Sequence, residues 1–311
     1  MRMIALFRFA AIGAVAVTIG ACGNGNGSGD DSRTFELKFA AVDGSTPVGC
    51  GDSINGLGPT GADRVEISDL RLYVSNLRFE TADGELVDAN LDANEFQYLD
   101  DNGEVALVDF TGTADGACTG GVTYAEGTAR TNLSITGSVE ATDIRGVQFD
   151  VGIPQAMMKS VIANHTAEDA PSPLAEMHWS WAFAYRFLVM NFVLYDGDDT
   201  RGEGYLHVGS NDCGGDGSKA LTDRDACGKP NAAKVSLTSF DIDNDTIVID
   251  VRQLLRNLDF EVTPVDAPAV PGVECHSSTE QPDCATIFGN LGINQATGSA
   301  NAASNQVFKV Q

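Results

Sequence analysis

The hydrophobic residues of this chain recur with a period of two, and this periodicity is the strongest constraint on its fold. Alternation places successive side chains on opposite faces of a strand, whereas an amphipathic helix repeats about every 3.6 residues. The runs that alternate, or that stay apolar between Gly, Asn and Asp, are Phe35–Phe39, Val65–Val74, Leu77–Phe79, Leu133–Val139, Val147–Val151, Phe187–Leu194, Val235–Phe240 and Thr246–Asp250. Many short strands at such spacing predict an all-β fold, specifically an antiparallel β-sandwich with long disulfide-stapled loops.

One or two short helices and several turns are expected between the strands. Pro154–Asn164 would carry a proline in the first turn of a helix, and Asp250–Leu258 begins with a residue suited to cap one. Ala82–Glu85 separates two alternating runs and is typical of a hairpin turn. The chain becomes polar from Gly289, and only Val307–Val310 near its end is predicted to be an edge strand.

Length and charge limit the classes of function. The 311 residues are 43% hydrophobic, which is enough to bury a core, so the chain is expected to fold despite its formal net charge of -25. Such an acidic chain repels phosphate backbones, and the sequence contains no run of Lys and Arg that could replace their counterions. Nucleic-acid binding is therefore excluded, and charged partners are expected to be cationic.

The first thirty residues are typical of an exported lipoprotein. Arg2 and Arg8 flank the apolar run Ala10–Ile19, which is too short for a permanent membrane span but suits a signal peptide. The run ends in Ile-Gly-Ala-Cys at Cys22, which resembles a bacterial lipobox; an ordinary signal peptide cut nearby is the alternative. Residues 1–21 are thus predicted to be removed, residues 22–33 to form a tether from the lipid-bearing Cys22, and residues 34–311 to form a single domain. The lipid is expected to be the only contact with the membrane.

The residue after Cys22 is Gly23 rather than the aspartate typical of inner-membrane retention, so the lipobox resemblance points to the outer membrane.

Export also determines the redox state of the cysteines, because disulfides persist in oxidising compartments. Six cysteines follow Cys22, and they are predicted to form the three disulfides Cys213–Cys227, Cys275–Cys284 and Cys50–Cys118. The first two pairs are favoured because each is close in sequence within a loop rich in Gly, Asp and Pro, which leaves the third. No thiolate would then remain as a nucleophile or a metal ligand.

Familiar catalytic and metal-binding motifs are absent from the sequence. There is no G-x-S-x-G, H-E-x-x-H or P-loop, so the chain is predicted not to be an enzyme. Asp241–Asp245 resembles a calcium loop at first, but Thr246 stands where that loop needs Gly and Arg252 where it needs Glu. A β-turn is the better interpretation there, and Asp196–Thr200 is likewise expected to be a hairpin tip.

Histidine, methionine and tryptophan gather in one segment. The chain has four histidines, and His178 lies in Met177-His-Trp-Ser-Trp181, which holds both tryptophans, Trp179 and Trp181. On a strand the two tryptophans would share one face, so they could equally well pack a core while His178 faces solvent. With its thiols paired, the chain has only imidazole and thioether ligands left for a soft metal such as Cu(I).

This segment, which continues to Phe187, resembles the M-x-W-x-W-x-x-G-Y-K-F signature of the MbnP-like family, also described as metallo-mystery pair four-Cys proteins. Ala184 and Arg186 depart from the Gly and Lys of that signature. Further stretches resemble the family in the expected order, over about residues 35–260. They are Val65–Leu77, Val147–Pro154 followed by Asn164-His165, His207–Cys213 and Ile247–Leu255.

The resemblance implies an exported protein that binds copper as Cu(I) through histidines and partners a dihaem, MbnH-type peroxidase-like enzyme. It implies His207, His165 and His178 as ligands, and Trp179 or Trp181 as a tryptophan that the partner oxidises to kynurenine. His276 lies outside the stretches that resemble the family and is expected to be a surface residue. The alternative function, from another class, is a structural or adhesive β-sandwich lipoprotein without a metal.

Overall fold

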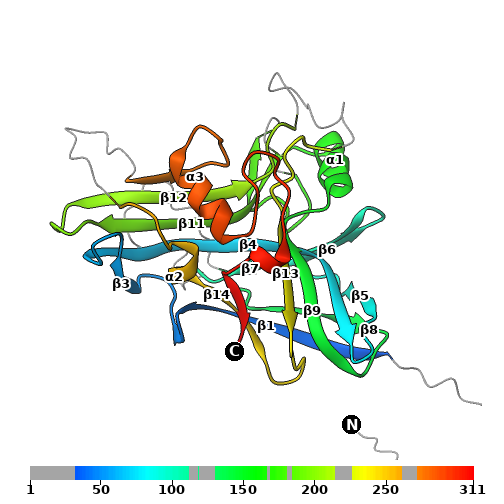
Figure 1. Cartoon of the computed structure of the whole chain (residues 1–311). Helices are drawn as coiled ribbons and strands as arrows, with labels where there is room; N and C mark the ends of the chain where they lie inside the picture. Colours follow the sequence, from blue (N-terminus) through cyan, green and yellow to red (C-terminus); the bar gives the residue numbers. More distant parts are fainter. Residues whose placement is uncertain are drawn as a thin grey trace, which may run out of the picture. The chain divides into compact units, whose positions relative to one another are not determined.

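The alternating runs form strands in the computed structural model, and these strands join into one strongly curled sheet (Figure 1). The structure describes residues 32–111, 118, 130–166, 169–180, 184–213, 226–260 and 272–311. The strands are β1 (Arg33–Asp43), β2 (Thr46–Pro47), β3 (Ser53–Leu57), β4 (Asp63–Thr81), β5 (Leu86–Leu91), β6 (Gln97–Asp100), β7 (Gly103–Asp109), β8 (Ser134–Val139), β9 (Ile144–Val151), β10 (His178–Ser180), β11 (Ala184–Tyr195), β12 (Arg201–Gly209), β13 (Ala233–Thr238), β14 (Thr246–Asp250), β15 (Val273–Cys275) and β16 (Phe308–Val310).

The long strand β4 holds the sheet together because it changes partners along its length. Its first half pairs with β11 on one edge and with β3 on the other, and its second half pairs with β9, β7 and β5. The register with β9 shifts between Ser75 and Arg78, where Asn76 has a positive φ of 51°. Such a bulge bends a strand and increases its twist, which accounts for the curl at this point.

The all-β class is confirmed, but the expected antiparallel sandwich is wrong in two respects. The strands form one continuous sheet, whose main path runs β15-β12-β11-β4-β5-β8-β1-β14-β16, instead of two stacked sheets. The sheet is also mixed, because β1 pairs with β14 and β12 pairs with β15 in parallel. Periodicity within a strand carries no information about the direction of its neighbour, so these parallel pairs could not be read from alternation.

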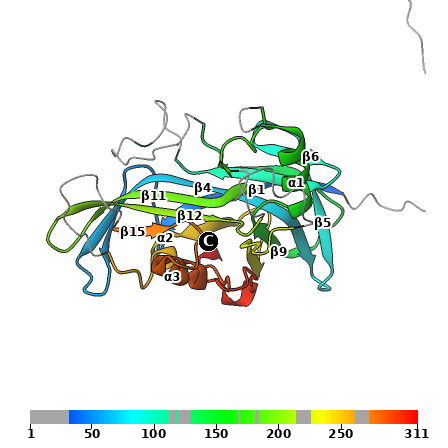
Figure 2. The same cartoon turned by 90° about the horizontal axis from the view of Figure 1, so that it is seen from above.

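Short helices cover both faces of the sheet. Helix α1 (Gln155–Asn164) lies on one face, and α2 (Val251–Leu254) and α3 (Pro282–Asn290) lie on the other (Figure 2). A larger hydrophobic core fills the side of α2 and α3, and a smaller core packs under α1. The first two helices were predicted, and the carboxylate of Asp250 caps α2 by accepting a hydrogen bond from the Gln253 amide at 3.3 Å. Helix α3 was not predicted, because its segment was expected to be a loop.

Several local predictions are confirmed. The three disulfides are Cys50–Cys118, Cys213–Cys227 and Cys275–Cys284. Residues 82–85 turn between β4 and β5, residues 196–200 turn between β11 and β12, and β16 pairs with β14. Asp241–Asp245 forms a turn in which the Asp245 amide donates to the Asp241 carbonyl at 2.9 Å.

The predicted signal peptide, Cys22 and most of the predicted tether lie outside the described residues, which begin at residue 32. Residues 31–311 cluster as one compact unit. In the described part of the chain, no helix combines the length and the apolar character that a membrane span requires.

Candidate metal centre

A row of polar side chains lies on the face of β12 that points away from the larger core. Along β12, Leu206 and Val208 belong to that core, so the alternation sends Glu203, Tyr205 and His207 to the opposite face. The row is buried: His207 is 4% exposed and Tyr205 is 2% exposed. Burying polar groups is costly unless they find partners, so the neighbours of this row matter for both stability and function.

The parallel pairing of β12 with β15 brings a second histidine beside His207. In this register Tyr205 lies opposite Glu274 and Leu206 lies opposite Cys275, so His276 follows directly beside His207. The two rings are in contact, with 4.7 Å between their centroids and 2.9 Å between their Nδ1 atoms. The Ser277 hydroxyl supports this register, since it donates to the His207 carbonyl at 3.0 Å and accepts from the Gly209 amide at 2.8 Å.

The outer nitrogens of both rings also have partners. His207 Nε2 lies 2.8 Å from Oδ1 of Asn191, a fully buried residue of β11, and His276 Nε2 lies 3.1 Å from the Glu274 carboxylate. The two rings differ in their access to solvent. The His276 and Glu274 side chains are 27% and 44% exposed, so the pair reaches the surface on the side of β15.

Two aromatic side chains border the histidine pair. The Trp179 ring stands perpendicular to that of His207, with centroids 6.3 Å apart, and its centroid lies 6.1 Å from that of His276. The Tyr205 ring stacks on His276 at 6.4 Å and lies 6.2 Å from His207, and its hydroxyl donates to the Glu203 carboxylate. The imidazoles are thus flanked by an indole and a phenol, with water largely excluded around His207.

Burial keeps both imidazoles neutral at neutral pH. Desolvation lowers the pKa of His207 well below that of a free side chain, and the charges of Arg186, His276 and Arg71 lower it further. Desolvation also lowers the pKa of His276, although the neighbouring Glu274 carboxylate opposes this effect. A neutral imidazole has a nitrogen lone pair to donate, which is the state that metal binding requires.

The structure brings together only some of the predicted site residues. His207 and Trp179 meet as described above, whereas His165 ends α1 and His178 packs edge-on against Tyr185, with ring centroids 5.4 Å apart. Trp181 lies outside the described residues.

His276 was expected to be only a surface residue; it is partly exposed, but it also has a contact that was not expected. It is the histidine that contacts His207, although 69 residues separate the two in sequence. A sequence signal did exist: Glu274-Cys-His276 repeats the alternation of Glu203, Tyr205 and His207, and its cysteine is disulfide-bonded. That pattern points to a contact between His276 and His207 only once β15 is known to lie beside β12.

The histidine pair offers two nitrogen donors, which suits a metal that accepts few ligands. No group of three His, Cys, Asp or Glu side chains arranged around a metal position is found among the described residues. Zn²⁺ in structural sites usually takes four such ligands, so the pair alone does not suit it. Imidazole suits copper, and the reduced ion Cu(I) is bound well at low coordination number. The two imidazoles are therefore candidate copper ligands.

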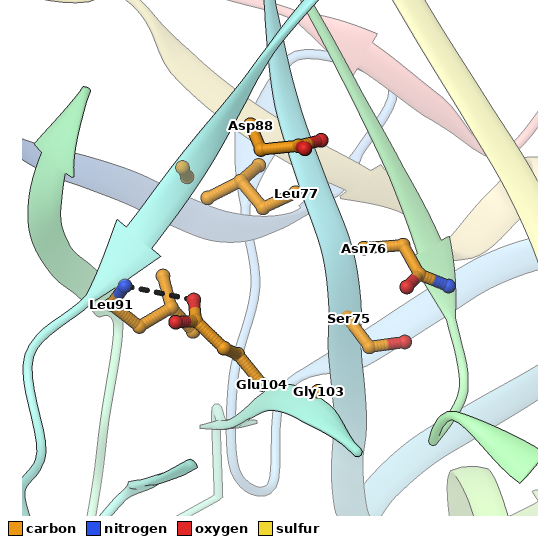
Figure 3. A pocket seen from close by; sticks show the side chains of 8 residues that line it. Ser75, Asn76, Leu77, Asp88, Leu91, Gly103 and Glu104 are labelled. Atoms are coloured by element: carbon orange, nitrogen blue, oxygen red, sulfur yellow. Dashed lines mark hydrogen bonds between the residues drawn. The ribbon is translucent and has the colours of Figure 1, made fainter. Parts of the chain in front are cut away.

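A separate pocket of about 280 Å³ lies between β4, β5 and β7 (Figure 3). The Glu104 carboxylate reaches across it and accepts a hydrogen bond from the Leu91 amide at 2.8 Å. The eight residues that line it include no imidazole, indole or thioether. Its chemistry therefore differs from that of the histidine pair.

Comparison with known proteins relates the chain to a family. The family model described as MbnP matches residues 32–277, a range that includes both His207 and His276. Among solved structures, MbnP from Methylosinus trichosporium is similar with a TM-score of 0.67 and 25% sequence identity. That similarity covers 90% of this chain and 98% of the other. No match is found among curated proteins. Because the family model covers most of the chain, the protein belongs to the MbnP family.

Proposed function

We propose that this protein binds copper as Cu(I) between His207 and His276, beside Trp179. The observation that carries the proposal is the direct contact of two imidazoles, with Nδ1 atoms 2.9 Å apart, in a largely buried position. Both rings are held neutral by burial and so have lone pairs for a metal. This ligand pair replaces the set of three histidines expected from the family resemblance.

Trp179 is our candidate for oxidation to kynurenine. Its ring lies within contact range of both histidine rings, so oxidation of Trp179 would change the chemical groups beside the proposed metal position. An intact indole has an N–H donor and no lone pair for a metal. A kynurenine carries an aryl amine and a ketone, which would add donor atoms to a site that otherwise has two.

The proposed role is that of an accessory protein and not of an enzyme. The partner that we propose is a dihaem, MbnH-type peroxidase-like enzyme, which would supply the oxidising equivalents for Trp179. The net charge of -25 supports an attraction for a cationic partner surface or for cations themselves.

The proposed location is outside the cytoplasm, with a lipid on Cys22 anchoring the protein at the outer membrane. Three disulfides are consistent with export into an oxidising compartment. A lipid on Cys22 would hold the β-domain at the membrane surface, where a soluble or membrane-bound partner could reach it.

A Cu(I) competition titration tests the copper site. The soluble form that begins after Cys22 is expected to bind one tight equivalent, and His207→Ala and His276→Ala should each weaken binding by at least about 100-fold, because even supporting residues of metal sites cost 10–100-fold. His165→Ala and His178→Ala are matched controls, in which the affinity should stay within about threefold of the wild type.

Two outcomes would contradict the proposal. Retention of tight copper in both His207→Ala and His276→Ala would place the metal elsewhere. If the protein binds no tight copper even after co-expression with a dihaem partner, the structural or adhesive function without a metal is the better explanation.

A further inference from the structure

The position of His276 depends on contacts outside the sheet ladder. Strand β15 has only three residues and lies at one end of the sheet path, and His276 follows it directly, beyond the last residue paired with β12. The disulfide Cys275–Cys284 ties β15 to α3 and not to β12. Segments with few contacts open most easily, so the approach of His276 to His207 needs further support.

Two side chains supply such support by binding the backbone at Gly209, two residues after His207. The Ser277 hydroxyl accepts a hydrogen bond from the Gly209 amide at 2.8 Å and donates one to the His207 carbonyl at 3.0 Å. In addition, Nδ2 of Asn231 donates to the Gly209 carbonyl at 2.8 Å. Ser277 therefore links the residue after His276 to the backbone of His207, and Asn231 holds the end of the same strand.

Ser277 and Asn231 share an unfavourable backbone conformation. Their φ angles are 58° and 49°, in the left-handed region that glycine adopts most readily. Both residues are buried, and Oδ1 of Asn231 has no hydrogen-bond partner among the described residues, which is a further cost in the interior. Glycine would relieve the backbone at either position, but it has no side chain that could bind Gly209.

We propose that Ser277 and Asn231 are positioning residues, which hold the end of β12 so that the His207 ring stays in contact with that of His276. This inference rests on the proposed copper site and deepens it. Left-handed conformations of residues other than glycine persist where the surrounding structure imposes them, and they cluster at functional sites. Residues that orient the ligands of a metal matter for its affinity, and their loss costs about 10–100-fold.

Glycine substitutions at left-handed positions separate positioning from backbone strain. Ser277→Gly and Asn231→Gly relieve the backbone but remove the contacts with Gly209, and each should weaken Cu(I) binding by the soluble form by about 10–100-fold. Ser239→Gly and Asn257→Gly are the matched controls, since both residues are exposed and have φ angles of 59° and 64°. These controls relieve the same backbone conformation, and their affinity should stay within about threefold of the wild type.

Alanine at Ser277 distinguishes the hydroxyl from the flexibility of glycine. Ser277→Ala should weaken Cu(I) binding as much as Ser277→Gly, although it should be the less stable protein in denaturant, because it keeps the left-handed backbone. Wild-type affinity in either variant would overturn the role of the hydroxyl. Circular dichroism checks the fold, and a variant that does not fold would show that its residue supports the whole protein and is not a positioning residue.

The contact between the two rings can be measured without any metal. Their centroids are 4.7 Å apart, so a nuclear Overhauser effect is expected between ring protons of His207 and His276. His207→Ala and His276→Ala identify the signals. The effect should persist in Ser239→Gly and be lost or clearly weaker in Ser277→Gly. An unchanged effect in Ser277→Gly would overturn the inference, whether or not the protein binds copper.

The two measurements separate failure of this inference from failure of the proposed function. If the rings separate in Ser277→Gly while the affinity for Cu(I) stays unchanged, the positioning role of Ser277 at the metal site is overturned. If instead the wild type shows the contact and Ser277→Gly loses it, but neither protein binds copper, the proposed function is overturned while Ser277 still holds the two rings together.

Discussion

At the scale of single residues, surroundings distinguish the histidines from one another. His207 and His276 touch each other, Trp179 and Tyr205, whereas His178 packs against Tyr185. Burial lowers the pKa of both histidines of the pair, so they remain neutral where an exposed histidine would begin to take up protons. The chemistry that we assign to the site follows from these contacts more than from the residue type.

The polar face that carries His207 also contains a fully buried ion pair. Arg71 Nε and Nη2 donate to the two carboxylate oxygens of Asp69, at 2.8 and 2.6 Å, and both side chains are 0% exposed. Removing one charge of such a pair leaves the other poorly compensated in a low-dielectric interior. This pair is therefore expected to matter far more for stability than the ion pairs at the surface.

We predict that Asp69→Asn lowers the free energy of unfolding by about 3 kcal/mol, because the Arg71 charge loses its buried partner. Chemical denaturation monitored by circular dichroism measures this change. Asp43→Asn is the matched control, since Asp43 pairs with the partly exposed Arg252 and should cost less than about 1 kcal/mol. Equal losses in the two variants would contradict the prediction.

At the scale of elements, the pair β11 and β12 determines where the site residues lie. Gly209 ends β12, two residues after His207, and a Cβ atom there would lie 2.2 Å from the Tyr185 carbonyl oxygen of β11. The close approach of the two strands thus requires glycine at this position. In α3, by contrast, a Cβ atom at Gly289 would meet no atom within 4 Å.

We predict opposite effects for alanine at these two glycines. Gly209→Ala should destabilise the protein by about 3 kcal/mol, because the backbone must move to relieve the overlap. The same movement should displace His207 and so weaken Cu(I) binding. Gly289→Ala should stabilise the protein by about 0.5–1 kcal/mol, as expected for an open helical position. Thermal and denaturant unfolding measure both effects; a Gly209→Ala protein as stable as the wild type would show that the strands can separate without cost.

The element scale also shows where prediction from sequence succeeded. The strand around Val65–Val74 and the helix Pro154–Asn164 were predicted because their signals are local: alternation in the first, a proline at the start of the second. The helix α3 was missed because Pro and Gly in Pro282–Asn290 favoured a loop, although its proline stands in the first turn. Packing against β15 and α2 stabilises this helix, and packing is not a local signal.

At the scale of the whole molecule, the curled sheet separates two kinds of interior. The side of α2 and α3 is a hydrophobic core, and the other face carries the smaller core together with the polar row that ends in the histidine pair. The row extends across β4, β11, β12 and β15, so the site depends on the correct pairing of four strands. Binding at such a site should be linked to the stability of the entire fold.

We predict that copper raises the free energy of unfolding of the soluble form by about 2.7 kcal/mol when free Cu(I) is 100 times its dissociation constant, provided that the unfolded chain does not bind it. Anaerobic denaturant unfolding in a Cu(I)-buffered solution measures this shift. The same addition should leave His207→Ala unchanged. Equal stabilisation of that variant would indicate that the metal acts at another place on the chain.

The family resemblance made His207 and Trp179 candidate site residues. The sequence by itself determined the local features: the strands formed by the alternating runs, the turns and the three disulfide pairs. Each of these depends on residues close in the chain, or on a small number of cysteines to be paired. Only the tertiary structure decided that the sheet is single, curled and mixed, and that His276 contacts His207. The parallel register between β12 and β15 joins residues about 70 positions apart, and alternation within either strand is the same whichever neighbour it pairs with, so this contact could not be derived from the pattern alone.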